Sequence, residues 1–585
     1  MSVQNGGMAT ATPEHLIPLD MCVFADHVDF DRITGFRSSN GISDKEQHSD
    51  DITGILAYPK YDDEQVVYMA GGELYKWDGT SSSNITTGGY SDTDSLRGVV
   101  WEDMLFGFVY DKTPFKYDGT DIVALGIPAP TVAPTVAAAN RPSGTLTDGT
   151  YKVYYTWYNS TLGWEGNPSP VASVAVASPN DAILVSDFQT YSMGTFGHEV
   201  SADFDKIRIY RSMIGSTSPY YVKTIDVGTA NTYIESIGIG TLHPQTYGEP
   251  PDGKYACVWD GRVWVAGVDE AEKTIYFSSN LYPSAFNTAD DSLTVLGEMP
   301  TEITGMKVIA GRMFCFTKTK IYQVAPYGDS YRIIDLGSPR GCIAPDSLVQ
   351  ITDCVVFLSY DGVYYFDRQN TYEMSYPIRD YFQADAQKLS LSNLSSAVAC
   401  HANRKYTLFA RSYSGTYNDT ALEFSLPVRR MSEASGTDGK AWSVKSATDA
   451  LCVGVSVSGA GADEVFIGRN SKYFSQYDTG YSSATSTYKT GQIAVDLLMG
   501  FDNRANAVAL HWKPTTAAIT ATLKWYLDGD ESRTGSISID LSQHDGYFKV
   551  DMATEAKTIQ FELSWANSGL TEVVRIYGLA ILEVS

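Results

Sequence analysis

An all-β protein is the fold class that the sequence predicts, with a β-propeller of about seven blades as its main part. Aromatic residues make up 12% of the 585 residues, and 39 Tyr, 23 Phe and 10 Trp accompany 50 Gly. Aromatic side chains favour strands, and glycine favours the turns between them. A pair of short strands also recurs along the chain, and two further blocks alternate apolar and polar residues. Since a chain of this length exceeds one hydrophobic core, we expect several β domains.

The recurring unit is a hairpin whose first strand is apolar or aromatic and whose second strand is rich in Tyr, Trp or Phe. Successive units begin about 40–60 residues apart, except for one step of about 160 residues that contains an insertion of about 115 residues. That period is typical of propeller blades, and radial repetition of blades leaves few exposed strand edges. The seven units are 66–79, 104–119, 262–279, 312–325, 355–367, 405–425 and 464–478.

Asp-Gly pairs occur in or beside these hairpins, in positions that look related. Asp-Gly supplies the two residues of positive φ that a type I′ turn needs, so we expect tight hairpin turns there. Calcium binding by these aspartates is disfavoured because no D-x-D-x-D-G loop surrounds them. The pairs are Asp78-Gly79, Asp118-Gly119, Asp260-Gly261 and Asp361-Gly362.

Linker composition divides the chain into domains. A Pro/Ala/Thr-rich stretch (127–144) and PQTYGEPPDG (244–253) bracket short alternating strands, which predict an inserted β-sandwich of the fibronectin type III or immunoglobulin class. Alternating segments after the last unit predict a second sandwich of jelly-roll type, and the polar, weakly periodic first residues predict an arm that orders on assembly. The expected domains are 1–50 (N-terminal arm), 51–127 (first part of the propeller), 128–250 (inserted sandwich), 251–480 (second part of the propeller) and 481–585 (C-terminal β-sandwich).

The chain is acidic, with a net charge of −26 and a pI of about 4.6. This argues against a protein that reads nucleic-acid sequence, because phosphate contacts need clustered Lys and Arg. An acidic wall would instead let DNA pass without sticking, although the acidity could also serve solubility alone. No apolar stretch reaches the roughly 18 residues of a membrane span, and the opening residues 1–16 lack a signal-peptide pattern, so we expect a soluble protein made in the cytosol.

Chemistry-bearing motifs are missing from the sequence, which contains no HExxH, GxSxG, P-loop, CxxC or strand-linked GxGxxG pattern. We therefore expect no enzyme, and no catalytic, cofactor-binding or metal-binding residues. The histidines lack ligand spacing, and the odd number of scattered cysteines favours reduced thiols in strands over disulfides. These residues are His15, His27, His48, His198, His243, His401, His511 and His544, and Cys22, Cys257, Cys315, Cys342, Cys354, Cys400 and Cys452.

Carboxylates and aromatic residues allow one alternative, a carbohydrate-binding or glycan-degrading protein. Paired carboxylates cleave glycosidic bonds, but the acidic clusters here lie where turns or arms are expected, and solvated charge is the default there. Aromatic side chains could line a receptor-binding face, although the same residues would fill the cores between blades. The clusters are Asp26/Asp29/Asp31, Asp62/Asp63/Glu64 and Asp528/Asp530/Glu531, and the aromatic residues are Tyr75, Trp77, Tyr117, Tyr364 and Tyr365.

Four phrases of the sequence resemble one family. YACVWDGRVWVAGVDEAEKTIYFSSNLYPSAFN (255–287) resembles the "GR" turn, "FS" strand and "P-x-x-F" ending of tail nozzle proteins of short-tailed bacteriophages, also called tail tubular or packaged-DNA stabilization proteins. The phrase 337–367, with its Gly-Cys-x-Ala-Pro-x-Ser turn and DGVYYF hairpin, is similar to that family as well. VDFDRITGFRSSNG (28–41) looks like its opening, and VVRIYGLAILEV (573–584) looks like the last strand of its terminal platform domain.

The resemblance implies a structural virion protein of the tail, made in the host cytoplasm, that contributes to genome retention and to DNA ejection into the host. It implies a homo-oligomeric ring, usually a hexamer, below the portal and adaptor proteins, with tail fibres or a needle or gate protein nearby. DNA would pass through the lumen without sequence-specific binding. The alternative remains a carbohydrate-binding or glycan-degrading receptor-binding tail protein.

Overall fold

A computed structural model gives the fold of the chain, which forms two compact units that are described one at a time. Unit 1 comprises Met1–Leu96, Thr301–Ala325 and Ile334–Ser585, and unit 2 comprises Arg97–Pro300 and Pro326–Ile333. The residues that the structure describes are 7–31, 35–60, 63–86, 89–127, 129–161, 163–190, 204–236, 248, 250–280, 282–287, 291–294, 302–426, 442–458, 461–480, 482–495, 503–543, 546–567 and 572–584.

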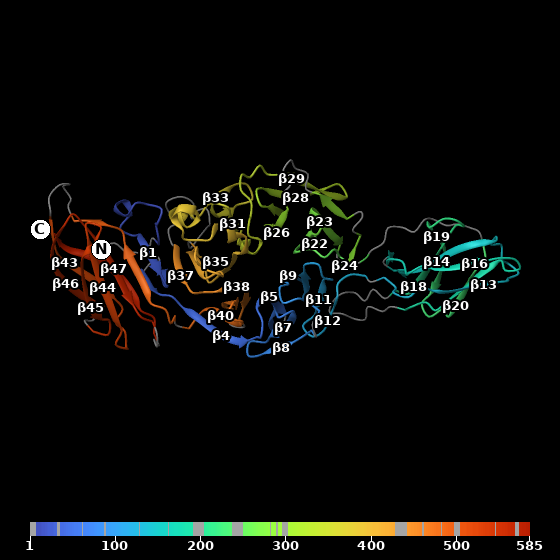
Figure 1. Cartoon of the computed structure of the whole chain (residues 1–585), viewed down its shortest axis with the longest axis horizontal. Coiled ribbons are helices and arrows are strands. Elements are labelled where there is room, and N and C mark those ends of the chain that lie inside the picture. The colour runs from blue at the N-terminus through green and yellow to red at the C-terminus, as the bar shows by residue number, and fades with distance from the viewer. Residues whose placement is uncertain are drawn as a thin grey trace. The chain divides into compact units, whose positions relative to one another are not determined.

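Strands form both units, as the composition predicts (Figure 1). No helix within the described ranges is both long enough and apolar enough to cross a membrane. The helices found there are short 3-10 helices: η1 (Glu14–Leu16), η2 (Pro345–Ser347), η3 (Tyr376–Phe382), η4 (Ala384–Ala386) and η5 (Leu391–Ser396).

Unit 1 contains five antiparallel sheets with the strand order of propeller blades, in which strands adjacent in the sheet are mostly adjacent in the chain. We number blades in chain order. Blade 1 is β5 (Ile52–Lys60), β6 (Asp63–Ala70), β7 (Glu73–Trp77) and β8 (Ser82–Asn84). Blade 4 is β26 (Ile303–Ile309), β27 (Arg312–Thr317), β28 (Ile321–Tyr327) and β29 (Ser330–Asp335), whose hairpin tip belongs to unit 2. Blade 5 is β30 (Val349–Ile351), β31 (Cys354–Ser359), β32 (Gly362–Phe366) and β33 (Thr371–Glu373).

Two further blades complete this set. Blade 6 is β34 (Val398–Ala402), β35 (Lys405–Ala410), β36 (Thr420–Ser425) and β37 (Trp442–Ser446). Blade 7 is β38 (Ala450–Val457), β39 (Asp463–Arg469) and β40 (Tyr473–Thr479), with β4 (Gly41–Gln47) as its fourth strand.

Unit 2 contains blades 2 and 3, which share one apolar core. Blade 2 is β9 (Leu96–Trp101), whose first residue belongs to unit 1, with β10 (Met104–Val109), β11 (Phe115–Tyr117) and β12 (Ile122–Ala124). Blade 3 is β21 (Tyr255–Trp259), β22 (Arg262–Val268), β23 (Ala271–Ser279) and β24 (Tyr282–Phe286), with the short β25 (Ser292–Thr294) beside β23.

Aromatic side chains fill the cores between neighbouring blades of unit 1. The rings of Phe409 and Tyr477 join blades 6 and 7 at 5.0 Å between centroids, and those of Tyr68 and Phe474 join blades 1 and 7 at 4.4 Å. Each of the seven sequence units supplies the second and third strands of one blade. The prediction of an all-β protein built around a β-propeller of about seven blades is therefore confirmed.

The inserted module in unit 2 is a sandwich of two antiparallel sheets that enclose one core. This confirms the predicted sandwich class, although the first strand, β13, pairs with β17 rather than with its neighbour in the chain. One sheet has the order β13 (Thr135–Ala139), β17 (Ala182–Ser186) and β20 (Asn231–Ile234). The other has β15 (Trp164–Glu165) and β16 (Ala172–Val176) beside β14 (Gly149–Asn159), followed by β18 (Lys206–Ser212) and β19 (Pro219–Asp226).

The C-terminal part of unit 1 is a second sandwich, as predicted, with Trp512 and Trp565 buried in its core. One of its sheets contains β41 (Ser486–Thr490), β42 (Ile493–Ala494), β44 (Thr520–Leu527), β45 (Asp530–Asp540) and β47 (Thr558–Trp565). The other contains β43 (Asn503–Trp512), β46 (Tyr547–Ala556) and β48 (Arg575–Val584).

The N-terminal residues, for which an arm was expected, supply strands to three places in unit 1. β1 (Cys22–Asp26) lies between β37 of blade 6 and β41, so that blade 6 and one sandwich sheet form a single ten-stranded sheet. β2 (Val28–Asp31) and β3 (Gly35–Ser38) extend the other sandwich sheet, and β4 completes blade 7. Figure 1 shows β1, in blue, beside the orange and red strands of the C-terminal sandwich. We call residues 22–47 the N-terminal segment.

The four Asp-Gly pairs do not share one turn type, and this part of the turn prediction is wrong. Only Asp260-Gly261 has two positive φ values, 51° and 65°, and it joins the first two strands of blade 3. Asp78-Gly79 and Asp118-Gly119 instead link third and fourth strands, and each aspartate accepts hydrogen bonds from two backbone N–H groups that follow it. In these two pairs the aspartate side chain stabilises the turn by accepting backbone hydrogen bonds, and the turn is not the type I′ turn that Asp-Gly predicts.

Candidate functional site: a buried charge network

The aromatic residues considered for a receptor-binding face mostly lie in the core. Trp77, Tyr117, Tyr364 and Tyr365 are buried, whereas Tyr75 is partly exposed and donates a hydrogen bond to Glu73. The packing interpretation is therefore confirmed for four of the five residues.

All seven cysteines are buried and none forms a disulfide, as expected for thiols in strands. Burial raises the pKa of Cys342 and Cys354 to about 12, which keeps both thiols protonated near neutral pH. These cysteines are packing residues, because the thiolate is the reactive form.

The histidines and acidic clusters that the structure describes do not gather into a metal site. Within the described ranges, no three His, Cys, Asp or Glu side chains lie close enough to hold a metal ion. Asp528 accepts hydrogen bonds from the backbone N–H groups of Lys557 and Thr558, as expected for a turn. The predicted candidates that lie outside the described residues are His198, His243, His544 and Asp62, together with the side chains of Asp31, Asp63 and Glu64.

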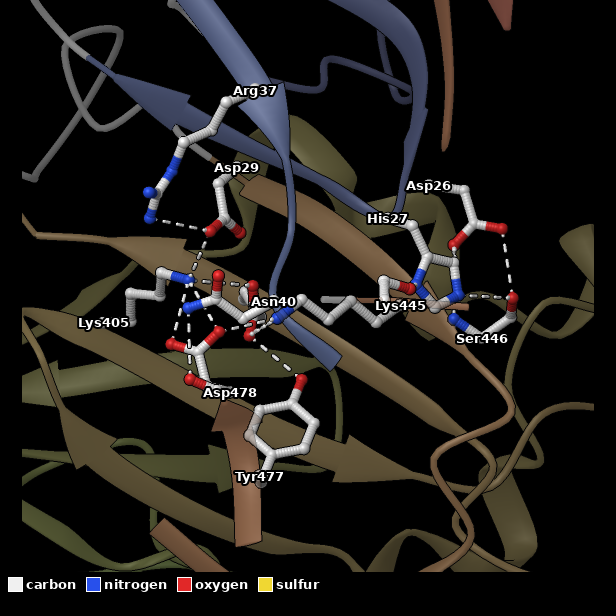
Figure 2. Close-up of polar contacts among 12 residues, drawn as sticks. Asp26, His27, Asp29, Arg37, Asn40, Lys405, Lys445, Ser446, Tyr477 and Asp478 are labelled. Carbon is white, nitrogen blue, oxygen red and sulfur yellow. Dashed lines mark hydrogen bonds and ion pairs between the residues drawn. The ribbon is translucent and has the colours of Figure 1, made fainter. Parts of the chain in front are cut away.

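One acidic cluster does lead to an unusual site. Asp29 of β2 belongs to a buried group of six formal charges, three positive and three negative, which we call the charge network (Figure 2). Its members are Asp29 and Arg37 from the N-terminal segment, Lys405, Glu423 and Lys445 from blade 6, and Asp478 from blade 7.

Two lysines hold the network together. The Lys405 Nζ atom lies 2.9 Å from Asp29 Oδ2 and 3.4 Å from Asp478 Oδ2. The Lys445 Nζ atom lies 3.0 Å from Glu423 Oε1 and 3.1 Å from Asp478 Oδ1. Asp478 therefore bridges both lysines, and the blade 6 strands are tied to blade 7 and to β2 through ammonium groups.

Neighbouring side chains fix the carboxylates further. The Tyr477 hydroxyl donates a 3.0 Å hydrogen bond to Glu423 Oε1, and Arg37 donates a 3.3 Å hydrogen bond to Asp29 Oδ2. The Asn40 side-chain amide donates to the backbone carbonyl of Asp478. Figure 2 shows these groups meeting where the N-terminal segment crosses the ends of the blade strands.

Burial and the ion pairs shift the pKa values of this network in opposite directions, and the ion pairs have the larger effect. Burial alone would raise the pKa of Asp478, but Lys445 and Lys405 hold that pKa well below its ordinary 3.8. Asp29 also has a lowered pKa, because Lys405 and Lys445 outweigh its burial. Burial alone would lower the pKa of Lys445, but Asp478 and Glu423 raise it above 10.5. These three groups are therefore charged at neutral pH.

The network is neutral in each of its two parts. The blade residues contribute two lysines and two carboxylates, and the N-terminal segment adds one aspartate and one arginine. Since each part balances its own charge, docking of the segment adds no net charge to the buried site. Asp29 Oδ1 has no hydrogen-bond donor among the described residues, which costs roughly 1–3 kcal/mol. Glu423 Oε2 makes no hydrogen bond there either but lies 3.6 Å from Lys405 Nζ.

A histidine beside the network has serine and aspartate neighbours but not the arrangement of a catalytic triad. Ser446 Oγ lies 3.4 Å from His27 Nε2, and Asp26 Oδ1 lies 3.7 Å from the same nitrogen, while buried Ser482 faces Nδ1 at 3.2 Å. A triad needs its carboxylate on the ring nitrogen opposite the nucleophile. Burial lowers the pKa of His27, so this histidine is neutral at pH 7 and serves as a hydrogen-bonded anchor.

Sequence reasoning named Asp29 only as part of a solvated cluster, and it named neither lysine. One signal does exist, because Glu423 interrupts the largely apolar strand TALEFS (420–425), whereas Lys405 begins its strand and Lys445 lies in the mixed strand WSVKS (442–446). Asp29, however, is 376 positions away from Lys405, and single-sequence periodicity carries no information on such a pair.

The fold and this network define a class of protein: a multidomain β-propeller whose N-terminal segment joins the propeller to a C-terminal sandwich. No family model matches the chain, and no curated protein sequence matches it. These two comparisons therefore assign the chain to no family.

Solved structures show only weak similarity to this chain. BamB from Moraxella catarrhalis is 10% identical with a TM-score of 0.32, and the match covers 75% of this chain and 96% of that chain. Apo AztD from Citrobacter koseri is 9% identical with a TM-score of 0.28, covering 72% and 95%. Hsv2 from Kluyveromyces lactis is 10% identical with a TM-score of 0.25, covering 68% and 97%. These scores are too low to carry an argument, so the fold assignment rests on strand pairing.

Proposed function

We propose that the chain is a non-enzymatic structural protein of a short-tailed bacteriophage tail, in which a ring of copies, usually six, forms part of the channel for genome retention and DNA ejection. The observation that carries the proposal is the pairing of β3 with β48, where Phe36 lies opposite Ile576. The opening and closing phrases of the family resemblance, 28–41 and 573–584, thus meet in one sheet. The two phrases that resemble the family lie at opposite ends of the sequence and are paired as strands. This pairing supports an architecture shared with that family.

The two longer phrases support the same reading. The phrase 255–287 covers β21 to β24 of blade 3, and 337–367 covers β30 to β32 of blade 5. Each phrase coincides with the hairpins of one blade, so the resemblance follows structural elements rather than scattered positions.

The net charge suits a channel for DNA. A surface with 26 more negative than positive side chains repels phosphate groups and does not retain them. The proposed partners are further copies of the chain, the portal and adaptor proteins, and tail fibres or a needle or gate protein. The proposed location is the virion tail, after synthesis in the host cytoplasm.

The carbohydrate alternative is not favoured by the residues that suggested it. Four of its five aromatic candidates are packed in the core, and stacking on a sugar needs an accessible ring face.

The test is the mass of the purified full-length protein in solution, together with negative-stain images, alone and mixed with virion extract. Rings with a central hole, or incorporation into tails, are the expected result. A protein that stays monomeric, joins no tail assembly and binds glycans would overturn the proposal and favour the carbohydrate alternative.

A further inference from the structure

Two exposed tyrosines of blade 5 and the turn after it share one arrangement. Tyr360 is 51% exposed and Tyr376 is 55% exposed. A guanidinium group lies 4.7 Å from the ring centroid in each case, Arg340 at Tyr360 and Arg379 at Tyr376. Each arginine also pairs with a carboxylate: Arg340 Nη2 lies 2.8 Å from Asp361 Oδ2, and Arg379 Nη2 lies 3.1 Å from Glu373 Oε2. We call these six residues the tyrosine patch.

The two halves of the patch adjoin each other around Gly362. Val363 donates a 2.9 Å hydrogen bond from its backbone N–H to Ser375 Oγ, which holds the residue before Tyr376 against the turn after Tyr360. A Cβ atom at Gly362 would lie 2.3 Å from the same Ser375 Oγ, so only glycine permits this approach. The chain segments that carry the two tyrosines are therefore held against each other, and both belong to unit 1.

The polar groups of the patch are largely used within the chain. Arg340 donates from Nε and Nη2 to the Asp361 carboxylate and from Nη1 to the Pro339 carbonyl. A sugar site needs convergent polar groups that are free to bind hydroxyls. Protein contacts instead favour rigid tyrosine and arginine side chains that present a large area with satisfied polar groups. The composition and the hydrogen bonding thus favour a protein surface over a glycan.

Charge indicates which protein would bind there. Copies of a chain with a net charge of −26 repel one another over most of their surface. The tyrosine patch carries two arginines and two carboxylates and has no net charge. Acidic copies can meet at such a patch without added repulsion, and rings held by arginine lose little side-chain entropy on contact.

We propose that the tyrosine patch is a contact surface for a second copy of this chain. The inference rests on the proposed ring and adds to it a specific surface that holds neighbouring subunits together. Tyr360 and Tyr376 supply the contact area, and Arg340 and Arg379 position their rings.

The test compares full-length wild type with Tyr360→Ala/Tyr376→Ala in a mass measurement over a range of concentrations, with ring images of both. The expected result is at least a tenfold rise in the concentration needed for half of the chains to associate. Tyr327→Ala is the matched control, because Tyr327 is also exposed and has Arg332 5.3 Å from its ring but lies outside the patch. Tyr360→Glu is a second variant. It adds a negative charge to the patch, so it should also weaken association relative to wild type.

The outcomes separate this inference from the proposed function. If wild type and double variant form rings at the same concentration, the patch is not a self-contact, while the ring itself stands. If the double variant loses a glycan signal and keeps its rings, the patch is a carbohydrate site and the inference is wrong. If wild type forms no ring at any concentration, alone or with virion extract, both the inference and the proposed function fail. Equal thermal unfolding of all variants would show that the substitutions leave the fold intact.

Discussion

Lys445 shows at the scale of one residue how the propeller tolerates charge in its interior. Its side chain is 2% exposed and pairs with Glu423, which is 1% exposed, and with Asp478. A buried ion pair contributes little net stability over an apolar replacement, but removal of one partner leaves an uncompensated charge. Removal of a single charged side chain should therefore cost more stability than replacement of the whole ion pair by apolar residues.

Lys445→Ala should lower the stability of unit 1 by about 3–5 kcal/mol, because Glu423 and Asp478 would lose their shared cation. Denaturant unfolding followed by tryptophan fluorescence measures this. Lys472→Ala is the control, since Lys472 pairs with Asp50 at 4.0 Å on the surface and should cost less than about 1 kcal/mol. Equal effects of the two substitutions would contradict a stabilising role for the network.

The pH dependence of stability should identify Asp478 separately. Its pKa in the folded protein lies below the ordinary 3.8, so its charge stabilises the fold above about pH 4, and this contribution falls as pH drops further. Asp478→Asn should thus melt earlier than wild type by the same margin at pH 7 and pH 5, and by a smaller margin at pH 3. A margin that grows on acidification would be inconsistent with the lowered pKa.

At the scale of elements, the N-terminal segment has the largest role relative to its length, because its four strands enter three sheets. Apolar contacts support this pairing: the rings of Phe36 and Tyr488 stack at 4.2 Å inside the sandwich. Residue Gly35 allows β3 to approach β48 closely, since a Cβ atom there would lie 2.2 Å from the Ile576 carbonyl oxygen.

Gly35→Ala should weaken the pairing of β3 with β48. Gly79→Ala is the matched control, because both glycines have positive φ, 109° and 92°, but nothing lies within 4 Å of a Cβ at Gly79. Both variants carry the backbone cost of about 1–2 kcal/mol, and Gly35→Ala adds the clash, about 1–3 kcal/mol more. Hydrogen exchange at Ser38, whose backbone N–H donates to the Val574 carbonyl, reports the effect; equal protection in both variants would refute it.

The sequence was informative about these elements only where apolar and aromatic residues cluster strongly. The second and third strands of every blade could be predicted, because their aromatic and β-branched residues are packed on both sides. The strand β4, GISDKEQ, has little alternation, and its position is set by pairing with β40 more than 400 residues later. The charge network was missed for the same reason: Asp29 is indistinguishable from a surface aspartate until Lys405 is brought beside it.

At the scale of the whole molecule, charge is the property that can be tested without knowing subunit arrangement. The purified protein should not retain duplex DNA even at about 50 mM salt, because its net charge is −26 and phosphate binding requires clustered cations. Electrophoretic mobility of labelled DNA measures this, with a basic DNA-binding protein as the positive control. A shift that weakens steeply with salt would contradict the proposed passive passage of DNA.

The ten-stranded sheet has a consequence for the order in which the protein can be made. A ribosome synthesises β1 to β4 first, but their partners β37, β40, β41 and β48 emerge about 400–550 residues later. At roughly 5–20 residues per second, the first strands wait on the order of 20–110 s before they can pair. During translation the nascent chain therefore carries unpaired apolar strands such as CVFAD (22–26). Blade 7 can close only after residue 479 has been made, and the sandwich only after residue 584.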